Sequence, residues 1–310
     1  MLWLRVVSVV SPVRQSIVTG LALLTLSALL FASMGVLIRL ASDTVDNPTV
    51  VFFRNLTGLL ILLPFFAIKG IHHLKTEKIW MHTWRALVGL LAMYGFFYAI
   101  AHLKLSNAMV FTYSSPIFIP LVAWLFLKEK MTELMWVAAG IGLIGVILVA
   151  KPDQGVFNLL SLIGLSSSFL AAMAFVTVRA MTSTEPASRI VFYFCLISTV
   201  ISAIPMFWLW RPYQSQELLL LAGAGTLATI SQLCLSTAYR FAPAGQIGPA
   251  NYMAIIFAGF WAALLWQEYP DLTSLLGMGV ILIALILCMP QFQRRTARTS
   301  APIAEPDPPL

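Results

Sequence analysis

Residues 17–38 read IVTGLALLTLSALLFASMGVLI, a stretch without a single charged side chain. As one helix, this stretch is long enough to cross a hydrocarbon layer about 30 Å thick. About ten such runs, separated by short polar breaks, follow one another along the 310 residues, of which 60% are hydrophobic and 10% charged. In lipid a helix satisfies its own backbone hydrogen bonds, so helices are the economical structure for runs this apolar. The sequence therefore predicts an all-α integral membrane protein.

The predicted spans divide evenly between the two halves of the chain. Polar breaks, several of them with a proline, mark their ends. The first half is expected to contain Ile17–Ile38, Thr49–Ile68, Trp84–His102, Ala108–Leu127 and Leu134–Ala150. The second half is expected to contain Leu159–Val178, Ile190–Trp210, Leu218–Tyr239, Ala244–Trp266 and Thr273–Met289.

The positive charges indicate how these spans are oriented. Lys and Arg prefer the short loops on the cytoplasmic side. With ten spans and both termini inside, most of the 19 basic residues, Arg85 among them, fall in the cytoplasmic set, and Arg54 is left within a span. The net charge of +7 is then a consequence of topology, so we expect no nucleic-acid partner. We expect a multi-pass protein of the bacterial cytoplasmic (inner) membrane, surrounded by lipid.

Several landmarks recur at nearly the same distance along the chain. Lys128-Glu129 and Gln267-Glu268 each end a span, and Val36–Arg39 is matched by Val176–Arg179. Two Gly-x-Gly motifs, at 140–142 and 277–279, each open the last span of a half. The sequence thus predicts a repeat of five spans.

An odd number of spans forces the second copy to enter the membrane from the opposite side. We therefore expect a 5+5 inverted repeat, with Glu129 at the cytoplasmic face and Glu268 at the outer face. This architecture is typical of secondary transporters, which bind their solute at mid-depth between the repeats. A duplicated scaffold that transports nothing is the alternative. The expected divisions are a cytoplasmic N-terminal segment (1–16), two repeats (17–151 and 152–290) and a disordered cytoplasmic tail (291–310).

Motifs within the first repeat point to a known family. Phe52-Phe53-Arg54-Asn55 opens span two, Ser114-Ser115-Pro116 lies in span four, and Leu127-Lys128-Glu129 is matched by Trp266-Gln267-Glu268. With these motifs and its ten spans, the chain resembles the drug/metabolite transporter superfamily in its form with two EamA-type domains, over about residues 17–290. The resemblance implies a permease for small organic solutes. It also implies a central cavity formed mainly by spans three, four, eight and nine, with one and six beside them. Spans five and ten would be peripheral, where they offer a surface for a homodimer.

Polar side chains inside the spans are candidates for lining such a cavity, because polar groups are costly in lipid. Tyr94, Tyr98 and His102 share one face of span three, where aromatic rings could stack on a planar solute. An aromatic packing stripe is the alternative. The amides in the later spans could equally bond a neighbouring helix. The further candidates, from spans four, eight and nine, are Asn107, Phe111, Ser115, Gln232, Ser236, Tyr239, Gln246, Asn251 and Tyr252.

Two prolines in span four, Pro116 and Pro120, and Pro249 in span nine predict that these helices bend or unwind locally. Exposed carbonyls at such a break can face a transporter's cavity.

Arg54 is a candidate for attracting an anionic solute into the outer vestibule. Alternatively it reaches the interface or pairs with Asp43 or Asp46. Glu129 and Glu268 are expected to pin loops, through Lys128, Lys130 or backbone amides, rather than to bind a solute.

Two other classes of protein remain to be weighed. A membrane enzyme would need an activated nucleophile or a metal cluster, and the sequence carries no motif for either. His72, His73 and His82 are expected in one cytoplasmic loop, where His72-His73 is expected to form a solvated polar turn rather than a metal site. We therefore expect no catalytic residue, metal or cofactor. A channel also needs a polar lining, and it would differ from a carrier by an unsaturable flux.

Overall fold

The computed structural model describes residues 16–42, 44–102, 114–129, 132–150, 159–267, 269 and 271–287. Within these ranges every regular element is a helix. Six helical segments within these ranges are long and apolar enough to cross a membrane, and three shorter apolar helices accompany them. These segments indicate an integral membrane protein that crosses the bilayer several times.

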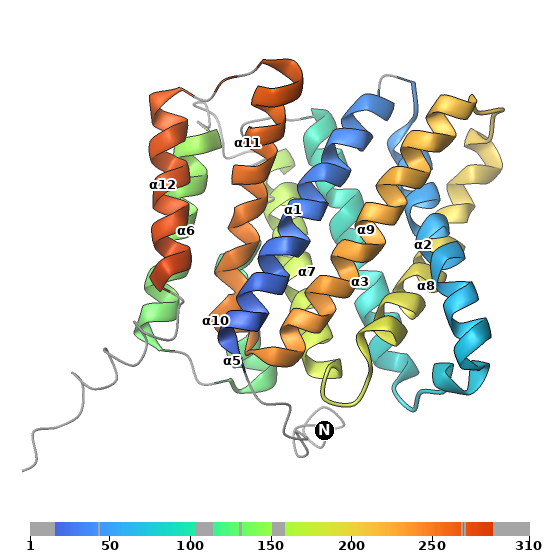
Figure 1. Cartoon of the computed structure of the whole chain (residues 1–310), viewed down its shortest axis with the longest axis horizontal. Coiled ribbons are helices and arrows are strands. Elements are labelled where there is room, and N and C mark those ends of the chain that lie inside the picture. The colour runs from blue at the N-terminus through green and yellow to red at the C-terminus, as the bar shows by residue number, and fades with distance from the viewer. Residues whose placement is uncertain are drawn as a thin grey trace, which may run out of the picture.

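Each predicted span overlaps a helix of the structure (Figure 1). Residues 103–113, with the predicted start of span four, lie outside the described ranges. The first half contains α1 (Ile17–Ala41), α2 (Asn47–Lys69), the 3-10 turn η2 (Ile71–Leu74), α3 (Ile79–His102), α5 (Ser115–Leu127) and α6 (Glu133–Ala150). The second half contains α7 (Leu159–Met181), α8 (Ala187–Leu209), α9 (Ser215–Phe241), α10 (Ala244–Ile247), the 3-10 turn η3 (Gly248–Tyr252), α11 (Met253–Trp266) and α12 (Leu272–Leu287).

The helices of the two halves pack mainly against each other rather than within their own half. α1 packs along α9 and α11, while α7 packs along α3 and α5. α2 packs on α8 and α9, and α8 in turn packs on α3. α6 and α12 form a separate pair at one edge of the bundle (Figure 1). The helices of the two halves correspond in order, α1 to α7, α2 to α8, α3 to α9, α5 to α11 and α6 to α12. If every helix in these pairs is replaced by its counterpart, the same set of pairs results.

α5 and α11 end in the same way. Lys128 and Gln267, the residues that cap them, are the two non-glycine residues with positive φ within the described ranges, at 54° and 58°. Their backbone N–H groups donate to Ala123 and Ala262 respectively. α5 ends at the bottom of the view in Figure 1 and α11 at the top, so the two matched ends lie at opposite ends of the bundle.

The predicted break in span nine is present. α10 ends at Ile247, and the 3-10 turn η3 carries Gly248 and Pro249 before α11 resumes the α-helix. Asn251 stabilises the break because its Nδ2 donates to the carbonyl of Gly248 at 2.9 Å. In span four Pro120 lies inside α5, which stays continuous from Ser115 to Leu127. Of the two expected outcomes, bending or local unwinding, unwinding does not occur within that part of span four.

Close contact between α6 and α12 depends on a glycine. A Cβ atom at Gly145 would lie 2.7 Å from Ile281 Cγ1 and 2.8 Å from the carbonyl oxygen of Gly277. At Gly140, on the same helix, a Cβ would meet nothing within 4 Å. Small residues allow membrane helices to approach this closely.

We predict that Gly145→Ala lowers the stability of the detergent-solubilised protein by about 1–3 kcal/mol, because the added methyl group overpacks the α6–α12 contact. Gly140→Ala is the matched control and should be neutral or stabilising by about 0.5–1 kcal/mol, since alanine favours the helix more than glycine does. Thermal unfolding followed by size-exclusion chromatography measures both. Equal midpoints for the two variants would contradict the close packing.

Candidate functional site

A cavity of about 170 Å³ lies inside the bundle. Residues of α1, α2, α3 and α5 line it together with residues of α7, α8, α9, η3 and α11. Among the described residues, α6 and α12 contribute nothing to this lining. Both halves therefore contribute to one site, and the peripheral pair stands apart from it. The polar lining consists of Ser27, Arg54, Arg85, Ser115, Ser167, Ser168, Ser231, Gln232 and Asn251.

Some of the residues expected at the site do line this cavity. They are Ser115, Gln232, Asn251 and the vestibule candidate Arg54. Asn107 and Phe111 lie outside the described residues, as do the side chains of Tyr98 and His102.

The face of α3 that meets the cavity is not the one on which Tyr94 lies. Tyr94 is half-buried and lies outside the described lining, to which α3 contributes Arg85, Gly89, Ala92, Met93 and Phe96. As far as the structure describes this helix, the cavity face carries one charged residue and four residues without a hydroxyl group in the side chain, namely Gly89, Ala92, Met93 and Phe96.

Four other candidates lie in the packed interior instead of the cavity lining. Tyr252 is fully buried and donates from its hydroxyl to the carbonyl of Ala139 at 3.1 Å, which joins η3 to α6. Tyr239 is fully buried in the core cluster around α1, α5 and α7. Ser236 Oγ and Gln246 Oε1 are buried without a hydrogen-bond partner. The rings of both tyrosines fill interior space between helices, and the hydroxyl of Tyr239 accepts from Nδ2 of the cavity residue Asn251 at 3.5 Å.

Arg85 is the main site residue that sequence reasoning missed. It was counted among the cytoplasmic loop charges, but α3 begins five residues before the predicted Trp84, so Arg85 lies in the second turn and is 3% exposed. Its Nη2 donates to Gln232 Oε1 at 2.9 Å, and its Cζ lies 3.7 Å from the ring centre of Phe194. A Cβ atom at Gly89 would come within 2.6 Å of Arg85 Nη1, so this glycine leaves room for the guanidinium. In the sequence, the one signal of a buried guanidinium here is a glycine, Gly89, placed one helical turn after Arg85.

Arg54 is the second buried cation of the cavity. It is 6% exposed, and its Nη1 lies 3.7 Å from Met93 Sδ. No ion pair joins it to Asp46, and Asp43 lies outside the described residues. The expected pairing in the preceding loop is therefore not found with Asp46, and Arg54 contributes directly to the cavity wall.

Neither arginine has a carboxylate partner within the described part of the chain, and Arg54 Nε, Arg85 Nε and Arg85 Nη1 have no hydrogen-bond acceptor. A cation–π contact like that of Arg85 with Phe194 contributes about 0.5–2 kcal/mol. Burying an ion costs several kcal/mol. Within the described residues, the contacts of these two buried charges leave three guanidinium nitrogens without an acceptor.

Hydrogen bonds of serines hold the cavity walls together in a repeated way. Ser27 on α1 and Ser231 on α9 each donate to the other's backbone carbonyl at 2.9 Å. At the corresponding position of the other pair, Ser167 on α7 donates to the carbonyl of Ala92 on α3 at 2.6 Å. These serines fix the helix pairs on either side of the cavity.

The arginines have no counterparts in this repeat. Ala92 and Ser231 occupy corresponding positions on α3 and α9. The same spacing along the chain relates Arg85 on α3 to Ala224 on α9. The matching helix starts at Asp46 and Pro186 relate Arg54 to Phe194. Both positive charges thus come from the first half of the chain, so they are not a requirement of the shared helix packing.

A family model described as "EamA-like transporter family" matches the chain twice, over residues 18–151 and 159–289. The chain belongs to the EamA-like transporter family. Its members are transporters, so this protein is a transporter and not an enzyme, as the sequence predicted. Within the described residues no group of His, Cys, Asp and Glu is arranged to hold a metal ion.

Individual relatives agree with the assignment of this chain to the EamA-like transporter family. The chain is 30% identical to a pseudopaline exporter of Pseudomonas aeruginosa, over 86% of this chain and 95% of the relative. It is 25% identical to an S-adenosylmethionine uptake transporter of Rickettsia felis, over 87% and 92% of the two chains. A solved crystal structure with 15% identity superposes with a TM-score of 0.76 over 89% of this chain and 98% of the other, which shows a shared fold.

Glu129 of the EamA-like transporter pins one helix end, although through a different partner from those expected. Its Oε1 lies 3.1 Å from Arg179 Nε at the end of α7. Arg179 Nη1 also donates to the carbonyl of Tyr239 at 2.6 Å, so α5, α7 and α9 meet at this point. Glu268 lies outside the described residues. At the matched site, Arg39 of α1 lies 4.1 Å from the ring centre of Trp266 on α11.

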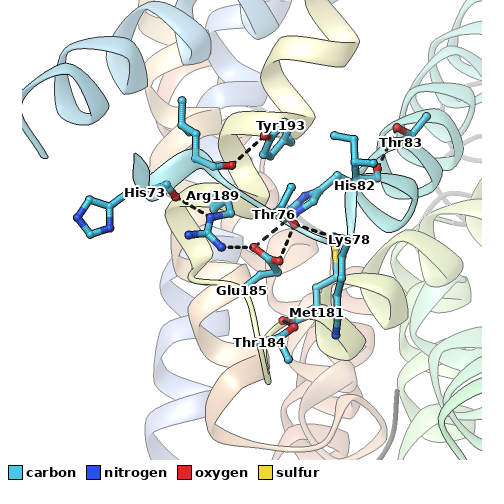
Figure 2. Close-up of polar contacts among 12 residues, drawn as sticks. His73, Thr76, Lys78, His82, Thr83, Met181, Thr184, Glu185, Arg189 and Tyr193 are labelled. Carbon is cyan, nitrogen blue, oxygen red and sulfur yellow. Dashed lines mark hydrogen bonds and ion pairs between the residues drawn. The ribbon is translucent and has the colours of Figure 1, made fainter. Parts of the chain in front are cut away.

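A second polar cluster surrounds Glu185 in the loop between α7 and α8 (Figure 2). Glu185 accepts from Thr76 Oγ1 and from Arg189 Nη1, both at 2.7 Å, and lies 3.6 Å from His82 Nε2. His82 is 1% exposed and lies within α3, so its expected place in a loop was wrong. Arg189 Nε donates to the carbonyl of His73 at 2.7 Å. The cluster ties the segment around η2 to the start of α8.

This environment lowers the pKa of the Glu185 carboxyl. Burial alone would raise that pKa, but contacts with His82, Thr76 and Arg189 outweigh burial and bring the pKa from 4.5 down to about 2. A carboxyl whose pKa falls on folding stabilises the folded state above its unfolded pKa, and this contribution disappears as the pH falls through the folded pKa.

We predict that Glu185→Gln destabilises the protein at pH 7 by about 1–3 kcal/mol, because Arg189 and Thr76 lose a charged acceptor. The difference from wild type should shrink as the pH falls from 4.5 towards 2, where the wild-type carboxyl also becomes neutral. Thermal midpoints in detergent at pH 7, 5, 4 and 3 would measure it. A constant difference across this range would contradict the role of the charge.

Proposed function

We propose that this protein is a secondary transporter that moves a small organic solute by alternating access between two inverted five-helix repeats. The observation that carries the proposal is one cavity lined by both halves of the chain, by α1, α2, α3 and α5 from the first and by α7, α8, α9, η3 and α11 from the second. The helix pairs of the surrounding bundle stay the same when the two halves are exchanged. Solute sites at the interface between repeats are the rule in transporters of this architecture.

Three further observations support the inverted repeat. The family model matches each half separately. The left-handed caps at Lys128 and Gln267 terminate corresponding helices at opposite ends of the bundle (Figure 1). The serine bond between α1 and α9 has its counterpart between α7 and α3. A repeat of five membrane crossings would produce each of these features.

The matched helix-end contacts suggest how the cavity opens. The ion pair of Glu129 with Arg179 joins α5 to α7 at one end. The contact of Arg39 with Trp266 joins α1 to α11 at the other. If the repeats exchange conformations, one of these contacts breaks while the other holds, and the cavity opens to the corresponding side of the membrane.

The solute is proposed to be small. A volume of about 170 Å³ is below the roughly 300–1,000 Å³ of pockets that hold drug-sized ligands. One relative is named as an exporter and another as an uptake transporter, so the direction of transport is left to experiment.

We predict that the two helix starts after the left-handed caps face opposite sides of the membrane. Cys195, Cys234 and Cys288 are first replaced, and single cysteines are then introduced as Thr132→Cys before α6 and Leu272→Cys at the start of α12. A membrane-impermeant maleimide should label position 272 in intact cells and position 132 in inverted vesicles. Labelling of both positions from the same side would refute the inverted repeat.

We also predict carrier kinetics in proteoliposomes. Labelled amino acids, organic acids, nucleosides and vitamins are tested for uptake into vesicles preloaded with the same unlabelled compound. At least one should show saturable counterflow, which empty liposomes lack. Flux that never saturates and shows no counterflow would identify a channel instead, and the absence of any flux would refute the transport function.

A further inference from the structure

We propose that the cavity takes organic anions. A carboxylate or phosphate group of the solute accepts hydrogen bonds from Arg85 beside Arg54, and the apolar body of the solute lies against phenylalanine rings. This inference rests on the proposed function, because it takes the cavity between the halves as the solute site.

The first argument is the balance of charge in the cavity. The described lining contains two arginines and no aspartate or glutamate. Arg85 is 3% and Arg54 6% exposed, so water screens neither charge well. A buried cation needs an anionic partner or a set of acceptors to compensate for its lost hydration. As far as the chain is described, the protein supplies no anionic partner and a single oxygen acceptor, Gln232 Oε1, and an anionic solute would supply the rest.

The second argument is the hydrogen-bonding state of Arg85. Gln232 holds its Nη2 and the ring of Phe194 lies against its Cζ, so the guanidinium is fixed in place. Its Nε and Nη1 have no acceptor. An arginine held in this way is preorganised for an oxyanion, and hydrogen bonds between ionised partners are among the strongest in proteins.

The third argument is the depth of the two arginines. Arg54 lies about 10 Å along α2 from its start, and Arg85 lies about 9 Å along α3 from its start, at 1.5 Å per residue. α2 runs down and α3 runs up in Figure 1, so the two arginines belong to helices that start at opposite ends of the bundle. Both arginines line the same cavity, so an anion bound there is near positive charges from two antiparallel helices.

The remaining wall determines what the anion is attached to. Phe31, Phe96, Phe175 and Phe194 come from four different helices. Three of the lining serines are already engaged, since Ser27, Ser231 and Ser167 donate to backbone carbonyls. The solute should therefore combine one anionic group with an aromatic or aliphatic body.

A matched set of probes tests the head group on the unmodified protein. Phenylacetate, phenyl phosphate, phenylacetamide and phenethylamine share one ring and differ in charge. At constant ionic strength, phenylacetate or phenyl phosphate should raise the thermal midpoint in detergent, since a ligand that binds only the folded protein stabilises it. The larger of these two shifts distinguishes a carboxylate site from a phosphate site. Equal stabilisation by the neutral amide or the amine, or no stabilisation by either anion, would overturn the proposal.

Substitutions then assign the binding to the arginines. Arg85→Gln and Arg54→Gln should each weaken binding of the stabilising anion about ten- to a hundredfold, the range for a lost hydrogen bond to a charged group. Arg85→Lys should recover part of this loss, because it restores the charge without the planar donor group. Arg240→Gln, at an exposed position of α9, is the control and should bind as wild type does. Unchanged anion binding in both glutamine variants would place the anion elsewhere and overturn the proposal.

The failure of this inference can be told apart from the failure of the proposed function. Probe binding is measured in detergent without a membrane gradient, whereas cysteine labelling and counterflow report topology and transport. Normal topology and counterflow without anion-selective binding would refute only the inference. Anion-selective binding without counterflow would refute the transport function and leave the anion site in place.

Discussion

Apolar helices in lipid gain little by hiding their side chains from the surroundings, because the lipid tails are as apolar as the side chains are. Association must therefore come from close packing and from polar bonds between helices. This constraint explains why the contacts between the halves are made by small and hydroxylated residues. Ser27 and Ser231 exchange hydrogen bonds across one helix pair, and Ser167 bonds Ala92 across the matching pair. Gly145 allows α6 and α12 to touch. These contacts hold the helix pairs on either side of the cavity and at the edge of the bundle.

The sequence was informative wherever a residue acted through its own stretch of chain. Long apolar runs predicted helices at the right places, and Pro249 predicted the break in span nine. The recurring Lys128-Glu129 and Gln267-Glu268 marked matched helix ends, which the structure describes as left-handed caps at Lys128 and Gln267. Such features depend on local backbone chemistry, so one sequence contains enough information to locate them.

The site was harder to predict because its residues act through partners on other helices. Charge counting treats every arginine near a span boundary as a loop residue, but Arg85 is held inside the bundle by Gln232, 147 positions further along the chain. Tyr252 was expected in the cavity because it is a polar residue within a span. Its side chain is instead fully buried between helices, and its hydroxyl donates to the carbonyl of Ala139 on α6. Glu129 was expected to contact neighbours in sequence, and its partner is Arg179. Long-range pairings of this kind leave no periodic signal in one chain.

The position of Gly89 has a consequence for how easily the cavity could change its chemistry. A single methyl group there would collide with Arg85 Nη1 and force the guanidinium off the ring of Phe194. The position of one positive charge in the cavity wall therefore depends on one hydrogen-sized space on the next turn of the same helix. A change from glycine to alanine would keep every polar residue of the chain and still displace the guanidinium group of Arg85 within the cavity. Solute preference in such a bundle can thus diverge through steric adjustments that leave the number of charges unchanged.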